Sequence, residues 1–336
     1  MNRAWHRTLR FALLLVAIGI LLPSRERFVR DVLIDARPAT VFTLVNDFRQ
    51  IDEWAPFTAD DPNARLDISG PATGVGASIG WKGRIIGQGR QTIVESVPFE
   101  RIVIEAVAGN GRPTRNIIQF AAAGGGTRIT WARERHYGFN LAGRYFGLLL
   151  DYVEGPRLEE HLLQLDDMAE SLPRADFSDL QVEKIYVQAQ DIAYLTTTSR
   201  PQAAALSAAM SDSFFDILGF IDAHGLTEAG APISITRRFS GSELTFDAAI
   251  PVRGITQDTP RAGTRVRIGK TYEGPVIRAI HRGSYARLGD THEKIAAYLA
   301  ASGIKRNGNT WESYVSEPGR TDASGLITYI YYPIRN

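Results

Sequence analysis

The chain contains no cysteine among its 336 residues. This absence excludes disulfide bonds, thiolate nucleophiles and zinc or iron–sulfur sites built on cysteine, and it is compatible with any redox compartment. The six histidines are scattered without the spacing of a metal site, at His6, His136, His161, His224, His281 and His292. We therefore expect no metal ion and no cofactor.

A net charge of one sign is also missing. Lysine and arginine together number 38 and aspartate and glutamate 37, which leaves a formal net charge of +1. A surface that neutralises a phosphate backbone needs a clear excess of basic residues. The sequence therefore predicts no nucleic-acid partner.

Common catalytic motifs are absent as well. The chain has no Gly-x-Ser-x-Gly nucleophile elbow and no His-Glu-x-x-His. The glycine-rich stretch 74–80 is not a dinucleotide fingerprint, because its third glycine comes one position late and a predicted strand follows where a helix should begin. We assign no catalytic residue from motifs.

The first 25 residues have the composition of a membrane segment. Arg3, Arg7 and Arg10 precede an apolar run from Phe11 to Leu22. This order is typical of a secretory signal or a signal anchor, and no small-x-small cleavage site follows. We expect an uncleaved, single-pass anchor over 1–25, with the bulk of the chain exported to a periplasmic or other extracytoplasmic space. A cleaved signal peptide remains an alternative, because the apolar run from Phe11 to Leu22 is shorter than the roughly 20 residues that a membrane span needs.

The remainder, with 44% hydrophobic and 22% charged residues overall, is long enough for two globular domains. Over 27–172 the pattern is strand, short helices, several strands and a long helix. Strands are predicted over 28–34, 77–84, 89–97, 101–107, 114–121 and 127–135, with helices over 38–45 and 141–172. Gly155-Pro156 is expected to break or kink the last helix.

Several short motifs in this segment resemble those of the START-like helix-grip superfamily, specifically its polyketide cyclase/dehydrase-type (SRPBCC) members. They are Pro38-Ala39 with Val41-Phe42, Trp54-x-Pro56-Phe57, Gly70-Pro71, Gly74-Val75-Gly76-Ala77, Trp81-x-Gly83 and Glu154-Gly155-Pro156. The resemblance implies a curved antiparallel sheet around a long carboxy-terminal helix, with an apolar ligand cavity between them. Trp54, Phe57, Trp81 and Trp131 are candidates for lining that cavity, although aromatic residues of such a fold also serve as plain core.

A linker over 173–181 leads to a second domain over 182–336, which contains an internal repeat. Gly303 follows Gly225 by 78 positions, and Gly308 follows Gly230 by the same 78. A helical segment precedes each glycine pair and two strands follow it. We predict two βαββ copies that share one sheet, so the whole chain is expected to be α+β.

This second domain resembles the gyrase-inhibitor-like (GyrI-like) domain that also binds effectors in AraC-type and multidrug-responsive regulators. The resemblance rests on the motifs Arg278-x-x-His281-Arg282-Gly283-Ser284-Tyr285, Trp311-Glu312-x-Tyr314 with Glu317-Pro318, and Leu326-x-Thr328-x-Ile330-x-x-Pro333. It implies a small-molecule cleft. The DNA-binding helices found in such regulators have no counterpart here.

Glu312 is the residue that we single out. In a strand, Glu312 and Tyr314 share one face, and the repeat places Ser234 at the position equivalent to Glu312. Packing alone therefore does not demand an acid. The resemblance implies that this glutamate is the buried acid of the cleft, a counter-charge for a cationic or hydrogen-bond-donating ligand. A solvated strand glutamate and a general acid or base acting with Tyr285 are the alternatives.

Other candidates for ligand contact surround Glu312 in the sequence. They are Tyr314, Tyr285, His281, Tyr329 and Tyr331, with structural packing as the alternative for each. The sequence favours a membrane-anchored binding protein for hydrophobic or amphipathic small molecules, including cationic aromatic ones. A cyclase- or hydrolase-like enzyme that uses Glu312 stays open, and no protein partner or oligomeric state is indicated.

Overall fold

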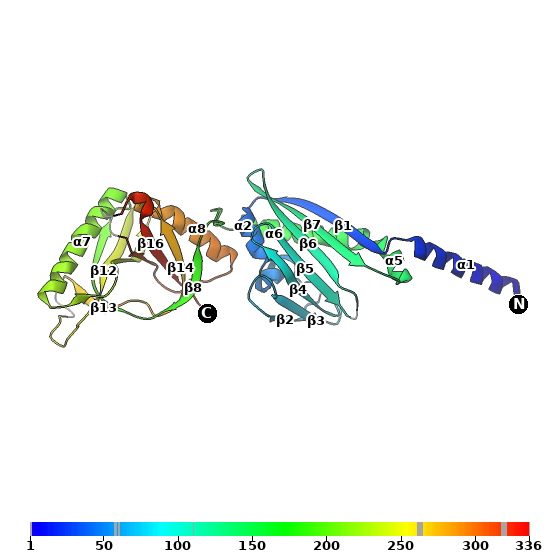
Figure 1. The fold of residues 1–336 in the computed structure, drawn as a ribbon, viewed down its shortest axis with the longest axis horizontal. Coiled ribbons are helices and arrows are strands. Elements are labelled where there is room, and N and C mark those ends of the chain that lie inside the picture. Colours follow the sequence, from blue (N-terminus) through cyan, green and yellow to red (C-terminus); the bar gives the residue numbers. More distant parts are fainter. Residues whose placement is uncertain are drawn as a thin grey trace. The chain divides into compact units, whose positions relative to one another are not determined.

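The computed structural model describes residues 2–56, 59, 61–109, 111–260, 265–316 and 321–335. The chain divides into two compact units, Met1–Ser178 with Ala300–Gly303 and Asp179–Leu299 with Ile304–Asn336 (Figure 1). Each unit combines helices with one antiparallel sheet. The α+β class expected from the sequence is confirmed.

The first unit has a seven-stranded sheet in the order β1-β7-β6-β5-β4-β3-β2. Its strands are β1 (Arg25–Ile34), β2 (Arg65–Ser69), β3 (Ser78–Lys82), β4 (Gln88–Val97), β5 (Arg101–Ala108), β6 (Thr114–Ala123) and β7 (Gly126–His136). Its helices are α1 (Asn2–Leu21), α2 (Pro38–Val45), η1 (Phe48–Gln50), α3 (Ile51–Trp54), α5 (Leu141–Gly147) and α6 (Leu150–Glu170).

The core of this unit lies between the sheet and α6 (Figure 1). Successive strand residues point to opposite faces, so Ile129 and Trp131 of β7 share the buried face. From α6, the residues Leu158, Leu162 and Leu165 recur at helical spacing and cover that face. The result is the sheet-and-long-helix arrangement that the motifs of 27–172 imply.

Two details differ from the predicted elements. Strand β2 was not predicted, because only Leu66 and Ile68 alternate in a short polar segment. Gly155-Pro156 does not break the last helix, which is interrupted instead at Leu148-Leu149, between α5 and α6. A Cβ at Gly155 would lie 2.4 Å from Nη2 of Arg30, so glycine lets the β1 arginine cross α6 closely. Packing of α6 on the core outweighs the hydrogen bond lost at Pro156.

The second unit has one sheet whose main path is β13-β9-β12-β11-β15-β16-β14-β8, with β10 paired to β12. Its strands are β8 (Val182–Val187), β9 (Asp191–Ser199), β10 (Thr227–Glu228), β11 (Ile233–Ser240), β12 (Glu243–Arg253), β13 (Arg267–Lys270), β14 (Gly274–Arg282), β15 (Trp311–Tyr314) and β16 (Ile327–Pro333). Its helices are α7 (Ala203–Ala223), η2 (Tyr285–Arg287), α8 (Leu288–Ala301) and η3 (Ala323–Gly325).

Two halves of this sheet have the same element order. The first half is β9, α7, β11 and β12, and the second is β14, α8, β15 and β16. The halves meet where β11 pairs with β15, and in that register Ser234 lies directly opposite Glu312. Each half has its own apolar cluster under its helix.

Helix α7 is long and apolar enough to cross a membrane by length and composition. Ile217, Phe220 and Ile221 of this helix are buried in the apolar cluster that it forms with β9 and β12. Packing on the sheet thus covers one side of the helix, whereas Phe215 and Leu218 are exposed. A third apolar cluster, which includes Ile233 and Trp311, involves the strand positions that alternate with those of the other two.

Candidate functional site

The Glu312 side chain lies on β15 near the centre of the second sheet, and 19% of its surface is exposed. Its Oε1 accepts a hydrogen bond from Nε2 of His292 at 2.8 Å. Its Oε2 accepts from the Tyr314 hydroxyl at 2.5 Å. Both carboxylate oxygens therefore have a donor, and the group is not bathed in bulk solvent.

His292 extends this contact into a chain of four groups. An ionised carboxylate only accepts hydrogen bonds, so the bond to Glu312 requires a proton on Nε2 of His292. In the neutral ring, Nδ1 is then the acceptor for the Tyr332 hydroxyl, at 2.7 Å. Tyr332, His292, Glu312 and Tyr314 form a continuous hydrogen-bonded relay.

The environment disfavours ionisation of the two phenols of the relay even more than water does. Burial raises the pKa of Tyr314 well above its ordinary value, and the nearby negative charge of Glu312 adds to this. Burial likewise raises the pKa of Tyr332 to about 12, with Glu312 adding to the rise and Arg306 opposing it. Both groups thus act as hydroxyl donors.

Tyr285 lies against the same site. Its ring meets that of Tyr314 edge to face, with 5.3 Å between ring centroids, and its hydroxyl donates to the Ser316 carbonyl at 3.2 Å. Burial raises the pKa of Tyr285. The structure therefore brings together three of the predicted site residues, namely Glu312, Tyr314 and Tyr285.

His281 has a positioning role next to the site. Its Nε2 lies 3.1 Å from the Ser284 carbonyl and its Nδ1 lies 2.8 Å from the Thr291 hydroxyl. The carbonyl can only accept, so Nε2 carries the proton and Nδ1 accepts from Thr291. These bonds hold the segment that bears Tyr285 and the first turn that bears His292.

Thr328 lies between Tyr314 and His281, because both of these residues pair with it across the strands. Its side chain is fully buried, and within the described residues its hydroxyl has no hydrogen-bond partner. An unpaired buried hydroxyl costs stability. The site thus contains one polar group whose hydrogen bonding the described protein atoms do not complete.

Tyr329 and Tyr331 lie on the other face of the sheet. Tyr331 pairs with Trp311 and Tyr329 with Ser313, the two β15 residues that alternate with Glu312 and Tyr314. The Tyr331 and Trp311 rings stack with centroids 4.7 Å apart and planes 6° apart. Arg278 lies 5.0 Å from the Tyr329 ring centroid. These predicted contacts do not join the Glu312 site.

The residue that sequence reasoning missed is His292. The local sequence of 290–293 indicates only a helix start, because its acidic residues suit the positive end of a helix dipole. Nothing in the local pattern marks which face of α8 meets β15. Placing His292 beside Glu312 would have required pairing the helix with a strand that begins ten residues after the helix ends.

In the first unit, Trp54 and Trp131 are packed in the core with ring centroids 6.2 Å apart. Trp131 donates from Nε1 to Asn116 at 3.2 Å, whereas Nε1 of the buried Trp54 has no partner within the described residues. Trp81 is half-buried and lies over Gly89 of the neighbouring strand. Phe57 lies outside the described residues.

Polar side chains occupy the continuation of this buried face. Arg133 donates to Asn116 at 2.8 Å and to Glu154 of α6 at 2.7 Å. On α6, burial lowers the pKa of His161 to about 4, and the positive charges of Arg157 and Arg133 act in the same direction. The sequence analysis assigned no ligand-binding or catalytic role to these groups.

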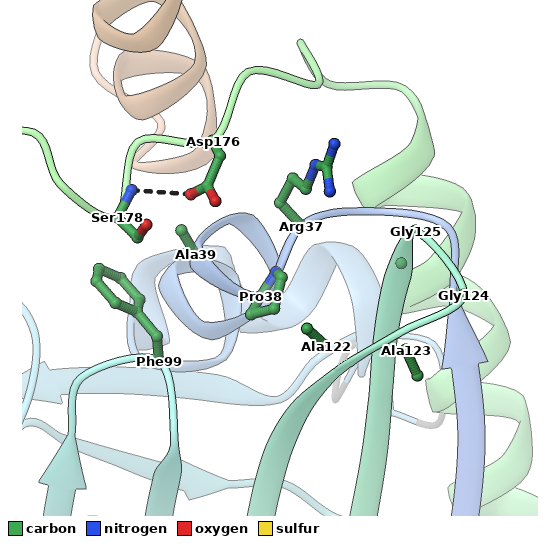
Figure 2. Close-up of a pocket in the computed structure, with 11 residues that line it drawn as sticks. Arg37, Pro38, Ala39, Phe99, Ala122, Ala123, Gly124, Gly125, Asp176 and Ser178 are labelled. Carbon is green, nitrogen blue, oxygen red and sulfur yellow. Dashed lines mark hydrogen bonds between the residues drawn. The ribbon is translucent and has the colours of Figure 1, made fainter.

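A separate cavity of about 430 Å³ lies in the first unit at the start of α2 (Figure 2). Pro38, Phe99 and the turn 122–126 line it, together with Asp176, whose carboxylate accepts from the Ser178 amide at 3.0 Å. The predicted aromatic residues Trp54, Trp81 and Trp131 do not line this cavity. Among the residues that the structure describes, no group of three or more His, Asp or Glu side chains is arranged for a metal ion.

Comparison with curated proteins gave no match. The crystal structure of the EcmrR C-terminal domain is 12% identical, covers 47% of this chain and 98% of its own, and has a TM-score of 0.38. The EcmrR–DNA complex is 13% identical, covers 60% and 86%, and has a TM-score of 0.41. The Aha1 dimer from Colwellia psychrerythraea is 17% identical, covers 43% and 96%, and has a TM-score of 0.31.

One family model also matches part of the chain. It confirms the resemblance indicated by the motifs of the first domain. Residues 25–170 match the family described as polyketide cyclase / dehydrase and lipid transport.

Proposed function

We propose that this protein is a membrane-anchored receptor or carrier for apolar or amphipathic small molecules, with a GyrI-like second domain that holds cationic aromatic ligands at Glu312. The family matched by residues 25–170 supports small-molecule binding in general. The repeated βαββ order and the central pairing of Ser234 with Glu312 support the GyrI-like assignment.

The observation that carries the proposal is the enclosed carboxylate of Glu312. Removing a carboxylate from water is costly unless donors compensate it. At the equivalent position of the other half, directly across the strands, the chain has Ser234. The sheet thus accepts a small polar residue at this point, which supports a ligand-binding role for the acid.

His292 defines how a cation would bind. Its Nε2–H already occupies Oε1 of Glu312, so it acts as an internal donor in the absence of ligand. A cationic ligand would interact with the same carboxylate, with the rings of Tyr285 and Tyr314 beside it. Glutamine supplies an uncharged N–H donor in place of the neutral imidazole, so His292→Gln should preserve cation binding.

Titration with N-methylacridinium, a planar aromatic cation, tests this function. We expect Glu312→Gln to weaken its binding at least about tenfold, the effect of losing about 1.4 kcal/mol. His292→Gln is the matched variant and should bind the cation at least as tightly as the unmodified chain. Equal affinity in the unmodified chain and in Glu312→Gln would contradict the site assignment.

Membrane anchoring through α1 is part of the proposal. The apolar side chains of α1 are exposed, among them Phe11, Leu13 and Ile20. Three arginines precede this run, which supports a cytoplasmic amino terminus and export of both units. A lipid bilayer would cover this exposed apolar surface.

The hydrogen-bonded relay supports a second candidate function, general acid–base catalysis. Glu312 lies between two donors, His292 and Tyr314, through which a proton could be exchanged with a bound substrate. Turnover of a polycyclic or strained-ring substrate, lost in Glu312→Gln and retained in Tyr331→Phe, would favour catalysis. Binding without turnover across such a substrate panel would favour the receptor.

A further inference from the structure

The second unit has a cavity on the face of the sheet opposite to Glu312. Its volume is about 340 Å³. Trp311, Ser313 and Tyr331 contribute from β15 and β16, and the segments around Gln188, Ala231 and Tyr272 complete it. Trp311 and Ser313 point to this side because strand residues alternate, whereas Glu312 and Tyr314 point to the other.

Aromatic rings form one side of this cavity. The Trp311 indole stacks on Tyr331 and lies 6.1 Å from the Tyr272 ring, centroid to centroid. Gly274 permits this position of Tyr272, since its φ is +143° and a Cβ there would lie 2.4 Å from the Tyr272 hydroxyl. Flat apolar faces arranged in this way suit a planar ring.

The polar lining groups are neutral. Gln188, Gln190, Thr271 and Ser313 supply amide and hydroxyl groups, and among the described residues no Asp, Glu, Lys, Arg or His lines the cavity. An ionic ligand would lose its hydration here without gaining a counter-charge. An uncharged ring system with hydrogen-bonding groups at its edge matches this lining.

We propose that this cavity is a second small-molecule site, specific for uncharged planar aromatic compounds and separated from the Glu312 site by the thickness of the sheet. This site goes beyond the proposed function and does not depend on it. The two sites share a strand and differ in charge, so each has a distinct ligand class.

Two probes of the same ring size separate the sites, N-methylacridone as the neutral ligand and N-methylacridinium as the cation. We expect N-methylacridone to quench tryptophan fluorescence, and the quenching should disappear in Trp311→Phe. Ser313→Phe, which places a ring in the cavity, should weaken N-methylacridone binding at least about tenfold. Ala231→Leu fills the cavity from a loop and should have the same effect if Ser313→Phe fails to fold.

The control is Glu312→Gln, which should leave N-methylacridone binding unchanged while it weakens the binding of N-methylacridinium. Ser313→Phe should conversely leave the binding of N-methylacridinium unchanged. Absence of N-methylacridone binding, or its loss in Glu312→Gln instead of Ser313→Phe, would overturn this inference. If only the expected effect of Glu312→Gln on N-methylacridinium binding were missing, that result would contradict the proposed function and not this inference.

An independent observation concerns the segment around α5 in the first unit. Phe139 is 96% exposed and Tyr152 is 83% exposed, and Phe146, Leu148 and Leu149 between them are also exposed. A water-soluble surface rarely presents so many large apolar side chains together. Aromatic residues among aliphatic ones are typical of a segment at a membrane–water interface.

This apolar segment is attached to the end of α1. Arg144 donates to the carbonyls of Ile20 at 2.7 Å and Leu22 at 3.0 Å, and the Tyr145 hydroxyl donates to Leu15 at 2.5 Å. Arg144 of α5 thereby satisfies the carbonyl of Ile20 in the last turn of α1. The exposed residues of 139–153 therefore continue the exposed apolar surface of α1.

We infer that the segment 139–153 lies in the interfacial region of a lipid bilayer, next to the anchor. This inference rests on the proposed membrane anchoring. It assigns the bilayer a second contact, which would hold the sheet-and-helix unit at the lipid surface.

The absence of cysteine makes single-site labelling possible in the full chain, reconstituted in vesicles of equimolar phosphatidylcholine and phosphatidylglycerol. An environment-sensitive fluorophore on Phe139→Cys or Leu148→Cys should be blue-shifted and several-fold less quenched by aqueous iodide than one on Val75→Cys, an exposed position distant in the sequence. A label on Leu13→Cys reports the anchor itself. If position 13 is protected while 139 and 148 match 75, this inference fails alone; if position 13 is also aqueous, the proposed anchoring fails.

Discussion

Enclosing a carboxylate constrains every neighbour that touches it. Glu312 has a donor at each oxygen, and these donors come from α8 and from its own strand. Ser234, in the paired position of β11, makes no such demand. At the scale of single residues, the second domain therefore departs from its internal repeat at the point where we place its chemistry.

A second residue-scale feature is His161 on α6, whose folded-state pKa of about 4 lies below the ordinary value of 6.5. The unfolded chain then binds more protons than the folded chain between these values. Stability is complete above about pH 6.5 and falls as the pH approaches 4. We expect urea unfolding at pH 7 and pH 5 to show a smaller loss of stability in His161→Gln than in the unmodified chain. An equal loss in both proteins would contradict this prediction.

At the scale of elements, the alternation of side chains along a strand gives one buried face in the first sheet and two occupied faces at β15 in the second. In the first unit it gathers apolar residues on the face that α6 covers. In the second unit, β15 is covered on both faces, so adjacent residues such as Trp311 and Glu312 belong to different sites. One short strand thus serves two surfaces.

The contact between strands β3 and β4 of the first sheet offers a stability test of element packing. A Cβ at Gly89 of β4 would lie 2.2 Å from the Trp81 ring and 2.6 Å from the Val107 carbonyl oxygen. We expect Gly89→Ala to destabilise the fold by about 1–3 kcal/mol, because the indole and the backbone must move.

Gly80→Ala is the matched control for this test. A Cβ at Gly80 on the neighbouring strand would have no contact closer than 3.7 Å. Because alanine also reduces the entropy of the unfolded chain, stability should be unchanged or raised by up to about 1 kcal/mol. Thermal unfolding of the two variants checks both values. Equal destabilisation would show that the Trp81 contact is not the cause.

At the scale of the whole molecule, the chain has two units of different topology, and the first of them begins with the 20-residue helix α1. The two sheets have different strand orders, and each unit has its own apolar clusters. The proposed topology then determines which compartment supplies ligands to both units. If α1 is an uncleaved anchor, both units lie on the side opposite to the amino terminus.

Reporter fusions at both ends of the chain test this topology. We expect a reporter that is active only after export to work at the carboxyl terminus and to fail at the amino terminus. Retention of α1 in the membrane fraction after carbonate extraction should accompany this result. A cytoplasmic carboxyl terminus would contradict export, and a shortened mature chain would indicate cleavage after the apolar run.

The sequence by itself determined the features that depend on neighbours along the chain. Alternation and helical spacing indicated most of the strands and helices, and the repeat predicted the βαββ order. The motifs of 27–172 indicated the family whose model matches residues 25–170. Glu312 and Tyr314 were expected on one face because strand geometry requires it.

Only the tertiary structure decided which faces meet. The register of β15 with β16 placed Tyr331 with Trp311, away from Glu312. The packing of α8 brought His292 to the carboxylate, although no local signal connects them. The physical reason is that register and helix rotation depend on burying apolar surface across the whole domain, so residues distant in sequence become neighbours through packing that no local pattern specifies.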